Sequence, residues 1–455
     1  MRQLITDALL QRKLTRPLAR VRRRLTFMAL LTGIGLLIAF LIVVVLIIRG
    51  QSPIIMLLLL AIVWALLARI SVNDIQAKVL QGGGVAYASA IIVIVFGAWF
   101  AQVLIQTGIA ESVIRSAVEL AGDRPLVTCM IVTTVTAIMF TSMYGVGAAI
   151  AVGVIALPIM MSQGVPPRVA APAFTMGIGA GSFVNLVQFA MYSKLFPGGV
   201  KYEFPYLKVW LIGGIIYLLA AFAMEFIYLR RLGVRQAASV SVTTKAPVRK
   251  RTPYYTYIVP IFPVLMIVVV KWEIIPTFLV SIVLALLLTC KDRTFQGNIN
   301  LFNKTFYDAF PDIATIAALW TICGMIIVAG QMPQISNALR PIFGPILPHT
   351  TLQAAIFFGL LGGIGSIYRG PLTLIGTGAA VLAIVTNSHD FASPFLYTLW
   401  LAPSCLQGSM DPTNSWTLWT IGYTKISHGD FLKTALPFGC LMVFFSTLVA
   451  YWMLG

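Results

Sequence analysis

Apolar segments of about 18–25 residues recur along the whole chain, and each is long enough to cross roughly 30 Å of hydrocarbon as one helix. The 455 residues are 59% hydrophobic and 10% charged. A soluble chain carries about a quarter charged residues, so no ordinary soluble fold suits this composition. The sequence therefore predicts an all-α, polytopic membrane protein with about 10–12 transmembrane helices.

Two basic stretches account for most of the net charge of +18. Residues 1–24 form a basic tail, and residues 231–253 form a basic linker between two apolar regions, 25–230 and 254–455. A basic run can bind nucleic acid, but beside an apolar segment it is typical of an anionic cytoplasmic membrane surface. We therefore expect the lipid bilayer as a partner and no nucleic acid.

The cysteines and histidines do not form a recognisable chemical site. The five cysteines fall in or beside apolar segments without paired spacing, and the three histidines fall in predicted loops. Buried cysteines behave as small apolar side chains. The sequence also contains no Gly-Lys-Ser/Thr phosphate-binding loop. We expect no metal, no cofactor, no enzymatic activity and no ATP-driven pumping.

The two apolar regions repeat the same landmarks in the same order, which indicates an internal duplication. Each region reads as a pair of spans, a third span, a partly polar stretch, two short legs, an interrupted span and a final span. The matching landmarks are Pro53 and Pro276, Gln106–Ile109 and Gln331–Ile335, Ser142–Gly145 and Ser366–Gly370, and Gly181-Ser182 and Gly408-Ser409.

Two kinds of segment interrupt the helices in each half. The legs within 126–162 and 351–387 have about 13–16 residues each, or about 20–24 Å as helices, too short for a crossing. They predict re-entrant hairpins. The spans 168–196 and 394–425 contain the breaking runs Gly177–Ser182 and Gly408–Asn414.

Matched breaks in both halves indicate a binding site. Non-helical backbone survives in a membrane only where protein or a water-filled cavity covers it. Small residues could instead serve close helix packing. Breaks at corresponding places favour the binding interpretation.

The orientation of the halves stays open. Five crossings and one hairpin per half would invert the halves, and the basic tail and basic linker would then face opposite sides. Basic residues favour the cytoplasmic side for both, so one crossing could be miscounted in the first half.

Two charged residues fall within the predicted breaks, where ionisable groups are functional candidates. Arg369 lies at the centre of the second hairpin, and Asp411 lies at the break of the second interrupted span. They could pair only with each other and brace the fold. Alternatively, Arg369 binds a substrate anion, and Asp411 takes a proton or a Na⁺ ion. Glu225 lies near a predicted helix end, where snorkelling would suffice.

The sequence therefore yields two sets of candidate site residues. The substrate-binding candidates are Ser142, Tyr144, Gly145, Ser182, Asn185, Ser366, Tyr368, Arg369, Gly370, Ser409 and Asn414, and the ion-coupling candidates are Asp411, Thr413 and Asn414, with a possible Na⁺ site at Asp411 and Asn414.

The chain resembles the ion transporter superfamily of bacterial secondary carriers, nearest to gluconate permeases and C4-dicarboxylate or citrate carriers. The resembling stretches are Gln106–Glu111, Thr141–Val165, and Asp411–Trp416 through Ser427 and Phe431–Lys433. The resemblance implies an elevator-type carrier in the bacterial inner membrane, coupled to H⁺ or Na⁺, that takes up a carboxylate. It also implies a homodimer.

A cation/proton antiporter of the same superfamily is the alternative. In that case Asp411 would be the exchange site and Arg369 its structural partner. Antiporters often have two or more deep carboxylates, and the sequence shows one clearly, which favours the organic anion.

Overall fold

The structure is a computed structural model. It describes residues 28–47, 49–120, 122, 124–233, 251–290, 294–343, 348–374, 378–388 and 391–455. The predicted tail at 1–24 and most of the predicted linker at 231–253 lie outside the described residues.

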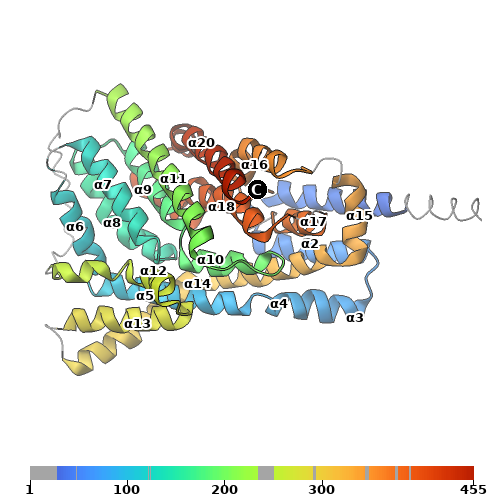
Figure 1. Ribbon diagram of the computed structural model, residues 1–455, viewed down its shortest axis with the longest axis horizontal. Coiled ribbons are helices and arrows are strands. Elements are labelled where there is room, and N and C mark those ends of the chain that lie inside the picture. The colour runs from blue at the N-terminus through green and yellow to red at the C-terminus, as the bar shows by residue number, and fades with distance from the viewer. Residues whose placement is uncertain are drawn as a thin grey trace, which may run out of the picture. The chain divides into compact units, whose positions relative to one another are not determined.

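Helices form all the regular secondary structure of the described residues (Figure 1). Over that part of the chain, five helices are long and apolar enough to cross a membrane, or six if the bent pair Pro167–Ser182 and Leu186–Leu195 is one span. Five further apolar helices have 15–17 residues. The predicted all-α, polytopic membrane fold is confirmed.

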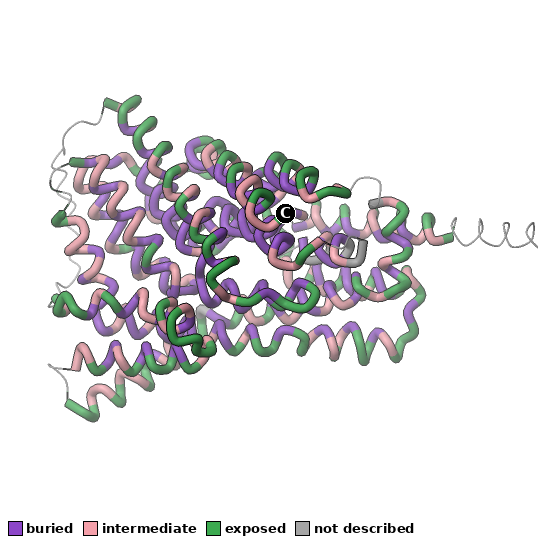
Figure 2. Tube along the Cα trace, in the orientation of Figure 1, coloured by how far each residue is buried: buried purple, intermediate pink, exposed green. Residues whose placement is uncertain are grey.

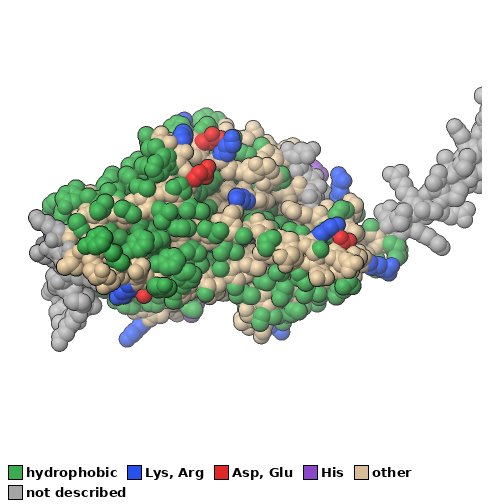
Figure 3. All heavy atoms as spheres, turned by 90° about the horizontal axis from the view of Figure 1, so that it is seen from below, with side chains coloured by type: hydrophobic (Ala, Val, Ile, Leu, Met, Phe, Trp, Pro, Cys, Tyr) green, Lys and Arg blue, Asp and Glu red, His purple; other side chains and the backbone are tan. Residues whose placement is uncertain are grey.

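The surface also suits a bilayer. On the outer helices of the second unit, described below, Ile215, Leu219, Leu441 and Phe445 are each more than half exposed. Apolar side chains cover much of the face in Figure 3, and charged side chains there are few and scattered. Exposed apolar surface of this extent is expected against lipid.

The chain divides into two compact units. The first contains Met1–Val85, Ile322–Leu347 and Ala380–His389. Its described elements are the helix Met28–Ile47, α2 (Pro53–Leu67), α3 (Val72–Asp74), η1 (Ile75–Gly82), α4 (Gly83–Val85), the end of α14 (Phe295–Gln331), α15 (Pro333–Phe343) and most of α17 (Gly378–Ser388). Within this unit the indole N–H of Trp64 donates to the carbonyl of Leu36 at 2.9 Å.

The second unit contains Ala86–Thr321, Pro348–Ala379 and Asp390–Gly455. Its further elements are α5 (Ala88–Gln106), α6 (Ile109–Glu119), α7 (Pro125–Met139), α8 (Val146–Ser162), α9 (Pro167–Ser182), α10 (Leu186–Tyr192), η2 (Ser193–Leu195), α11 (Phe204–Arg231), η3 (Tyr254–Ile258), α12 (Phe262–Leu265), η4 (Met266–Val270), α13 (Ile274–Leu288), α16 (Thr351–Ser366), α18 (Ser393–Met410), α19 (Ser415–Thr424) and α20 (His428–Leu454).

Two helices form the centre of the second unit. Helices α9 and α18 are buried along nearly their whole lengths (Figure 2). Helix α9 packs against α7 and α11, while α18 packs against α16 and α20, and the two central helices contact each other. This arrangement places the end of each central helix inside protein.

The order of helices after residue 28 is repeated after residue 254. The pairs in chain order are Met28–Ile47 with η3–η4, α2 with α13, α3–α5 with α14, α6 with α15, α7 and α8 with α16 and α17, α9 and α10 with α18 and α19, and α11 with α20. This order matches the predicted plan of two repeats. The compact units do not follow the repeats, and the predicted repeat bounds and membrane orientations stay predictions.

The helix breaks occur close to their predicted places. Helices α7 and α8 are separated at Phe140–Gly145, α9 and α10 at Phe183–Asn185 with a bend of 62°, and α18 and α19 at Asp411–Asn414. In the second half, α16 ends at Ser366. Short helices around broken backbone are therefore a property of this fold.

One predicted break was misplaced. The run Gly177–Ser182 is helical and forms the end of α9, and the chain breaks only after it. These glycines admit neighbouring backbone, since a Cβ at Gly177 would lie 2.7 Å from the carbonyl oxygen of Thr133 on α7. Close helix packing, the interpretation set aside above, explains this run.

Replacing Gly181 by alanine is expected to destabilise the protein by about 1–3 kcal/mol, because a Cβ there would overlap the carbonyl oxygen of Ala137. Exposed Gly422 on α19 is the matched control, since nothing lies within 4 Å of a Cβ at that position. Gly422→Ala should be neutral or stabilising by up to about 1 kcal/mol. Thermal unfolding in detergent measures both; equal effects would contradict the packing role.

The third helix of each half is longer than predicted. The apolar runs that predict these spans cover about 85–106 and 309–330 of the sequence, whereas helical structure runs over Val72–Gln106 and Phe295–Gln331. The additional helical turns contain polar residues. These residues are compatible with a helix, but a prediction based on the length of apolar runs does not include them.

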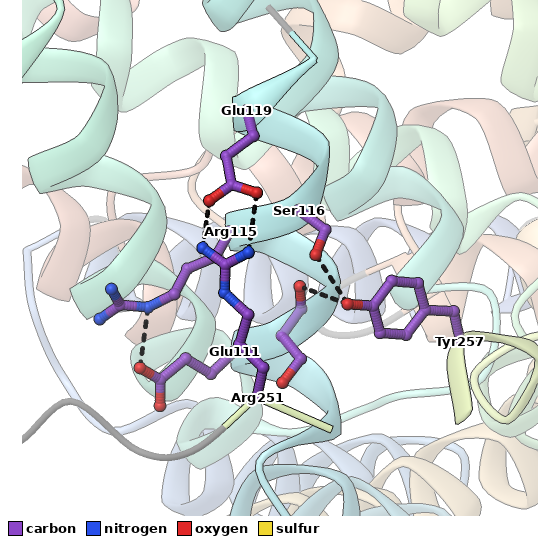
Figure 4. A network of polar contacts seen from close by, with 7 residues as sticks. Glu111, Arg115, Ser116, Glu119, Arg251 and Tyr257 are labelled. Atoms are coloured by element: carbon purple, nitrogen blue, oxygen red, sulfur yellow. Dashed lines mark hydrogen bonds and ion pairs between the residues drawn. The ribbon is translucent and has the colours of Figure 1, made fainter. Parts of the chain in front are cut away.

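A polar network joins α6 to η3 and to Arg251 just before it (Figure 4). Arg251 makes two bonds to the carboxylate of Glu119, and the hydroxyls of Ser116 and Tyr257 lie 2.7 Å apart. Hydrogen bonding to Arg251 lowers the pKa of Glu119. The network fixes where the second half begins relative to α6.

Candidate functional site

A cavity of about 320 Å³ lies within the second unit, where three helix breaks and the end of α16 meet. It is lined by Tyr144, Val146, Gln188, Tyr192, Pro311, Thr315, Ile316, Leu319, Trp320, Arg369, Ser404, Gln407, Gly408, Asn414, Ser415 and Trp416. Residues from both halves therefore line one cavity.

Asn185 holds the two breaks of the first half together. Its side-chain amide donates to the carbonyls of Phe140 at 2.7 Å and Met143 at 2.9 Å. Its side-chain oxygen accepts the N–H of Gln188 at 2.9 Å and so caps α10. These bonds satisfy backbone groups that the break deprives of helical partners.

The chain after α16 carries strained backbone. Tyr368 and Arg369 have φ values of 57° and 54°, a left-handed conformation that is uncommon for residues other than glycine. Two consecutive residues of this kind cost of order 1–3 kcal/mol each and persist only where their surroundings fix them. Such strain commonly occurs at ligand-binding sites.

Asp411 supplies the contact that fixes this strained turn. Its Oδ2 accepts the backbone N–H of Arg369 and the side-chain amide of Gln407, both at 2.9 Å. Its Oδ1 accepts the backbone N–H and the hydroxyl of Thr413, both at 2.8 Å. A carboxylate has about four acceptor positions. Four donors therefore use its capacity, which favours a positioning role.

Aromatic rings form one wall of the cavity. Tyr144 and Trp416 meet edge to face with ring centroids 6.0 Å apart. Tyr192 and Trp320 form a second pair at 5.7 Å. The indole N–H of Trp416 donates to the carbonyl of Gly408, a group that the α18 break frees. Rings anchored in this way give the cavity a fixed shape.

The polar groups of the cavity are mostly neutral. Among the lining residues, Arg369 carries the only full charge, and the amides of Gln188, Gln407 and Asn414 accompany it. The first turns of α8 and α19 also line the cavity, through Val146 and Ser415. Helix N-termini carry partial positive charge. The cavity is therefore positively biased.

Three of the predicted site residues, Tyr144, Arg369 and Asn414, line the cavity. Ser182, Ser366 and Ser409 donate instead to backbone carbonyls within their own helices, and Ser142 donates to that of Pro260. Thr413 bonds to Asp411 and Asn185 braces the first break, as described above. Gly145 (φ 115°) precedes α8, Tyr368 is 38% exposed, and Gly370 packs against the carbonyl of Gly365.

Sequence reasoning missed most of the polar and aromatic lining residues, among them Gln188, Gln407, Trp320 and Trp416. The two glutamines lie close to the breaks, in α10 and α18, and Trp416 is in the first turn of α19. Their spacing to the predicted breaks could have suggested them. Trp320 lies on α14, far from any break in sequence, and gave no such signal.

The fold is similar to that of a known transporter. The YdaH transporter of Alcanivorax borkumensis, whose crystal structure was described as having an unusual topology, aligns with a TM-score of 0.53 at 12% sequence identity. The alignment covers 90% of this chain and 98% of that chain. The chain therefore shares the fold of that transporter.

At this identity the likeness establishes the fold alone. No protein-family model and no curated protein matches the sequence. The sequence resemblance implied a transporter fold, and the likeness agrees with it at the level of the fold. It does not extend to gluconate permeases or citrate carriers, so that kinship stays a prediction.

Proposed function

We propose that this protein is an ion-coupled secondary transporter that takes up a small organic anion. The observation that supports this most is the cavity at the helix breaks, in which Arg369 is the one fully charged lining residue. Sites formed at broken helices are where many transporters bind their substrates. A single positive charge there suits an anion.

The lining chemistry indicates a carboxylate. The guanidinium of arginine matches the geometry of a carboxylate and can hold it by two parallel bonds. Gln188, Gln407 and Asn414 can donate further bonds, and the aromatic wall suits a short carbon skeleton. The cavity volume of about 320 Å³ lies at the small end of ligand pockets. A compact carboxylate is therefore the proposed substrate class.

Asp411 is proposed to position Arg369, because its carboxylate already accepts four hydrogen bonds. The coupling ion is proposed to be H⁺. A Na⁺ ion held by Asp411, Thr413 and Asn414 remains the second candidate, since carboxylate, hydroxyl and amide oxygens suit hard cations.

An elevator-type motion, a homodimer and a bacterial inner-membrane location complete the proposal. They are supported by the two-repeat plan and by the sequence resemblance.

The proposal is tested by uptake of labelled citrate, succinate and gluconate into proteoliposomes with imposed pH or Na⁺ gradients. At least one carboxylate should accumulate above its external concentration when the inward proton gradient is imposed. Accumulation driven by Na⁺ alone would favour the site at Asp411. Dissipation of a pH gradient by added cations, without carboxylate uptake, would instead support the antiporter.

A further inference from the structure

Glu225 is a buried carboxyl group that the candidate site does not use. It lies on α11 two turns before the end of the helix, where snorkelling to the interface was expected. The structure contradicts that expectation, because Glu225 is fully buried, with 0% of its surface exposed. It faces inward, toward other helices of the second unit.

The contacts of Glu225 are few for a carboxyl group. The hydroxyl of Thr133 on α7 donates to its Oε1 at 2.6 Å. Its Oε2 is buried without a hydrogen-bond partner. An ionised carboxylate that meets only neutral groups, here the Thr133 hydroxyl and the neighbouring Cys129 thiol, is very costly to bury, and such a group avoids the cost by taking up a proton.

In the described part of the chain, Glu225 forms no ion pair with a lysine or arginine. Helix α11 packs against α7, α9, α18 and α20. The titratable side chains on α11 and these helices, besides Glu225, are Cys129, Arg168, Tyr206, Lys208, Tyr217, Tyr228, Arg230, Arg231, Tyr397, Cys405, His428, Asp430, Lys433, Cys440 and Tyr451. Of these, the thiol of Cys129 neighbours the carboxyl group of Glu225.

Thr133 allows both protonation states of Glu225 to be hydrogen bonded. When Glu225 is ionised, the hydroxyl of Thr133 donates to Oε1. When Glu225 is protonated, its O–H can donate to Thr133, whose hydrogen can then turn to the carbonyl of Ala173 at 3.4 Å. A hydroxyl is both donor and acceptor, which suits this exchange.

Glu225 is also connected to the first break. Thr133 lies seven residues before Phe140, where the first break begins, about 10 Å away at the helical rise. Over this distance α7 packs on the glycines of α9, and Asn185 then joins the two breaks. A shift between α7 and α11 at Glu225 would therefore be transmitted to the cavity through packed helices.

We propose that Glu225 is the proton-carrying residue that couples this transporter to the proton gradient. The inference rests on the proposed function, because it assigns the coupling step of the same carrier. Glu225 binds a proton while it is buried among α7, α9 and α11. It releases that proton to water when the transport cycle separates these helices around Glu225. No bond other than the O–H bond forms or breaks.

Infrared difference spectra of the full-length protein in lipid nanodiscs, recorded between high and low pH, test proton binding without any substrate. The wild type should show the C=O band of a protonated carboxyl group, and Glu225→Gln should lose it. Glu203→Gln, just before the same helix, is the control and should retain the band. A band that persists in Glu225→Gln would overturn the proposal.

Transport by the same variants tests the coupling, using a carboxylate that the wild type accumulates. Glu225→Gln should lower gradient-driven accumulation at least about 10-fold while exchange of labelled for unlabelled carboxylate continues, and Glu225→Asp should restore part of the accumulation. Wild-type accumulation in Glu225→Gln, or equal loss of exchange in Glu225→Gln and Glu225→Asp, would overturn the proposal. If the wild type transports no carboxylate, the proposed function fails, while the infrared result still decides whether Glu225 holds a proton.

Discussion

Arg369→Gln is expected to lower carboxylate uptake by at least about 100-fold, while the protein still inserts into the membrane. Glutamine removes the charge and the planar fork that can bind a carboxylate by two parallel bonds. Hydrogen bonds to charged groups contribute about 1.5–3 kcal/mol each, and each 1.4 kcal/mol is a tenfold change in affinity. Initial uptake rates in proteoliposomes, at equal amounts of inserted protein, measure the effect.

Arg168→Gln provides the matched control. Arg168 is exposed in the first turn of α9 and does not line the cavity, so its replacement should leave uptake unchanged. Arg369→Lys keeps the charge but not the fork and should show an intermediate loss. Undiminished uptake by Arg369→Gln would exclude this arginine from substrate binding.

Asp411→Asn is expected to reduce both stability and uptake. An amide at this position keeps one oxygen but turns a donor toward the N–H of Arg369 and the amide of Gln407. Losing two charge-assisted bonds in a fully buried place should destabilise the protein by about 3 kcal/mol. The strained turn at Arg369 would then relax, and a shift of about 1 Å at a binding group can cost about 100-fold in rate.

Asp430→Asn is the control for this prediction. Asp430 lies in the exposed first turn of α20 and bonds to Ser427, so the change should cost about 1 kcal/mol or less. Thermal unfolding and initial uptake rates should be measured on the same preparations. If Asp411→Asn unfolds like the wild type but loses only its ion dependence, Asp411 is a coupling residue rather than a positioning one.

The sequence predicted the breaks because composition alone weakens a helix at particular places. Asp411–Asn414 contains a proline and three polar residues in an otherwise apolar stretch, and the observed break coincides with it. The legs around Phe140–Gly145 were predicted from their length, which is also a local property. The recurrence of the same features in the second half then supported each of these predictions independently.

Other features depend on partners that are distant in the chain. The glycines of α9 break helices in isolation but here admit the backbone of α7, a contact between residues about 40 positions apart. Glu225 was misread for a similar reason. Its distance from a helix end suggests access to the interface, whereas burial is decided by which helices surround it.

The composition of the cavity was the least predictable part. Tyr144, Arg369 and Asn414 were found because they lie at breaks, but Trp320 reaches the cavity from α14. The serines at the breaks were misleading, since a serine in a helix often bonds to a carbonyl of its own preceding turn. Sequence position predicted the breaks that lie beside the cavity, and tertiary packing decides which side chains line it.

The most direct test of the binding site is an experimental structure of the protein in lipid nanodiscs with the best-transported carboxylate at saturating concentration. We expect density for the carboxylate in the cavity between Tyr144 and Trp416, with its carboxylate within hydrogen-bonding distance of the guanidinium of Arg369. A bound carboxylate elsewhere in the protein, with side chains filling this cavity, would contradict the account.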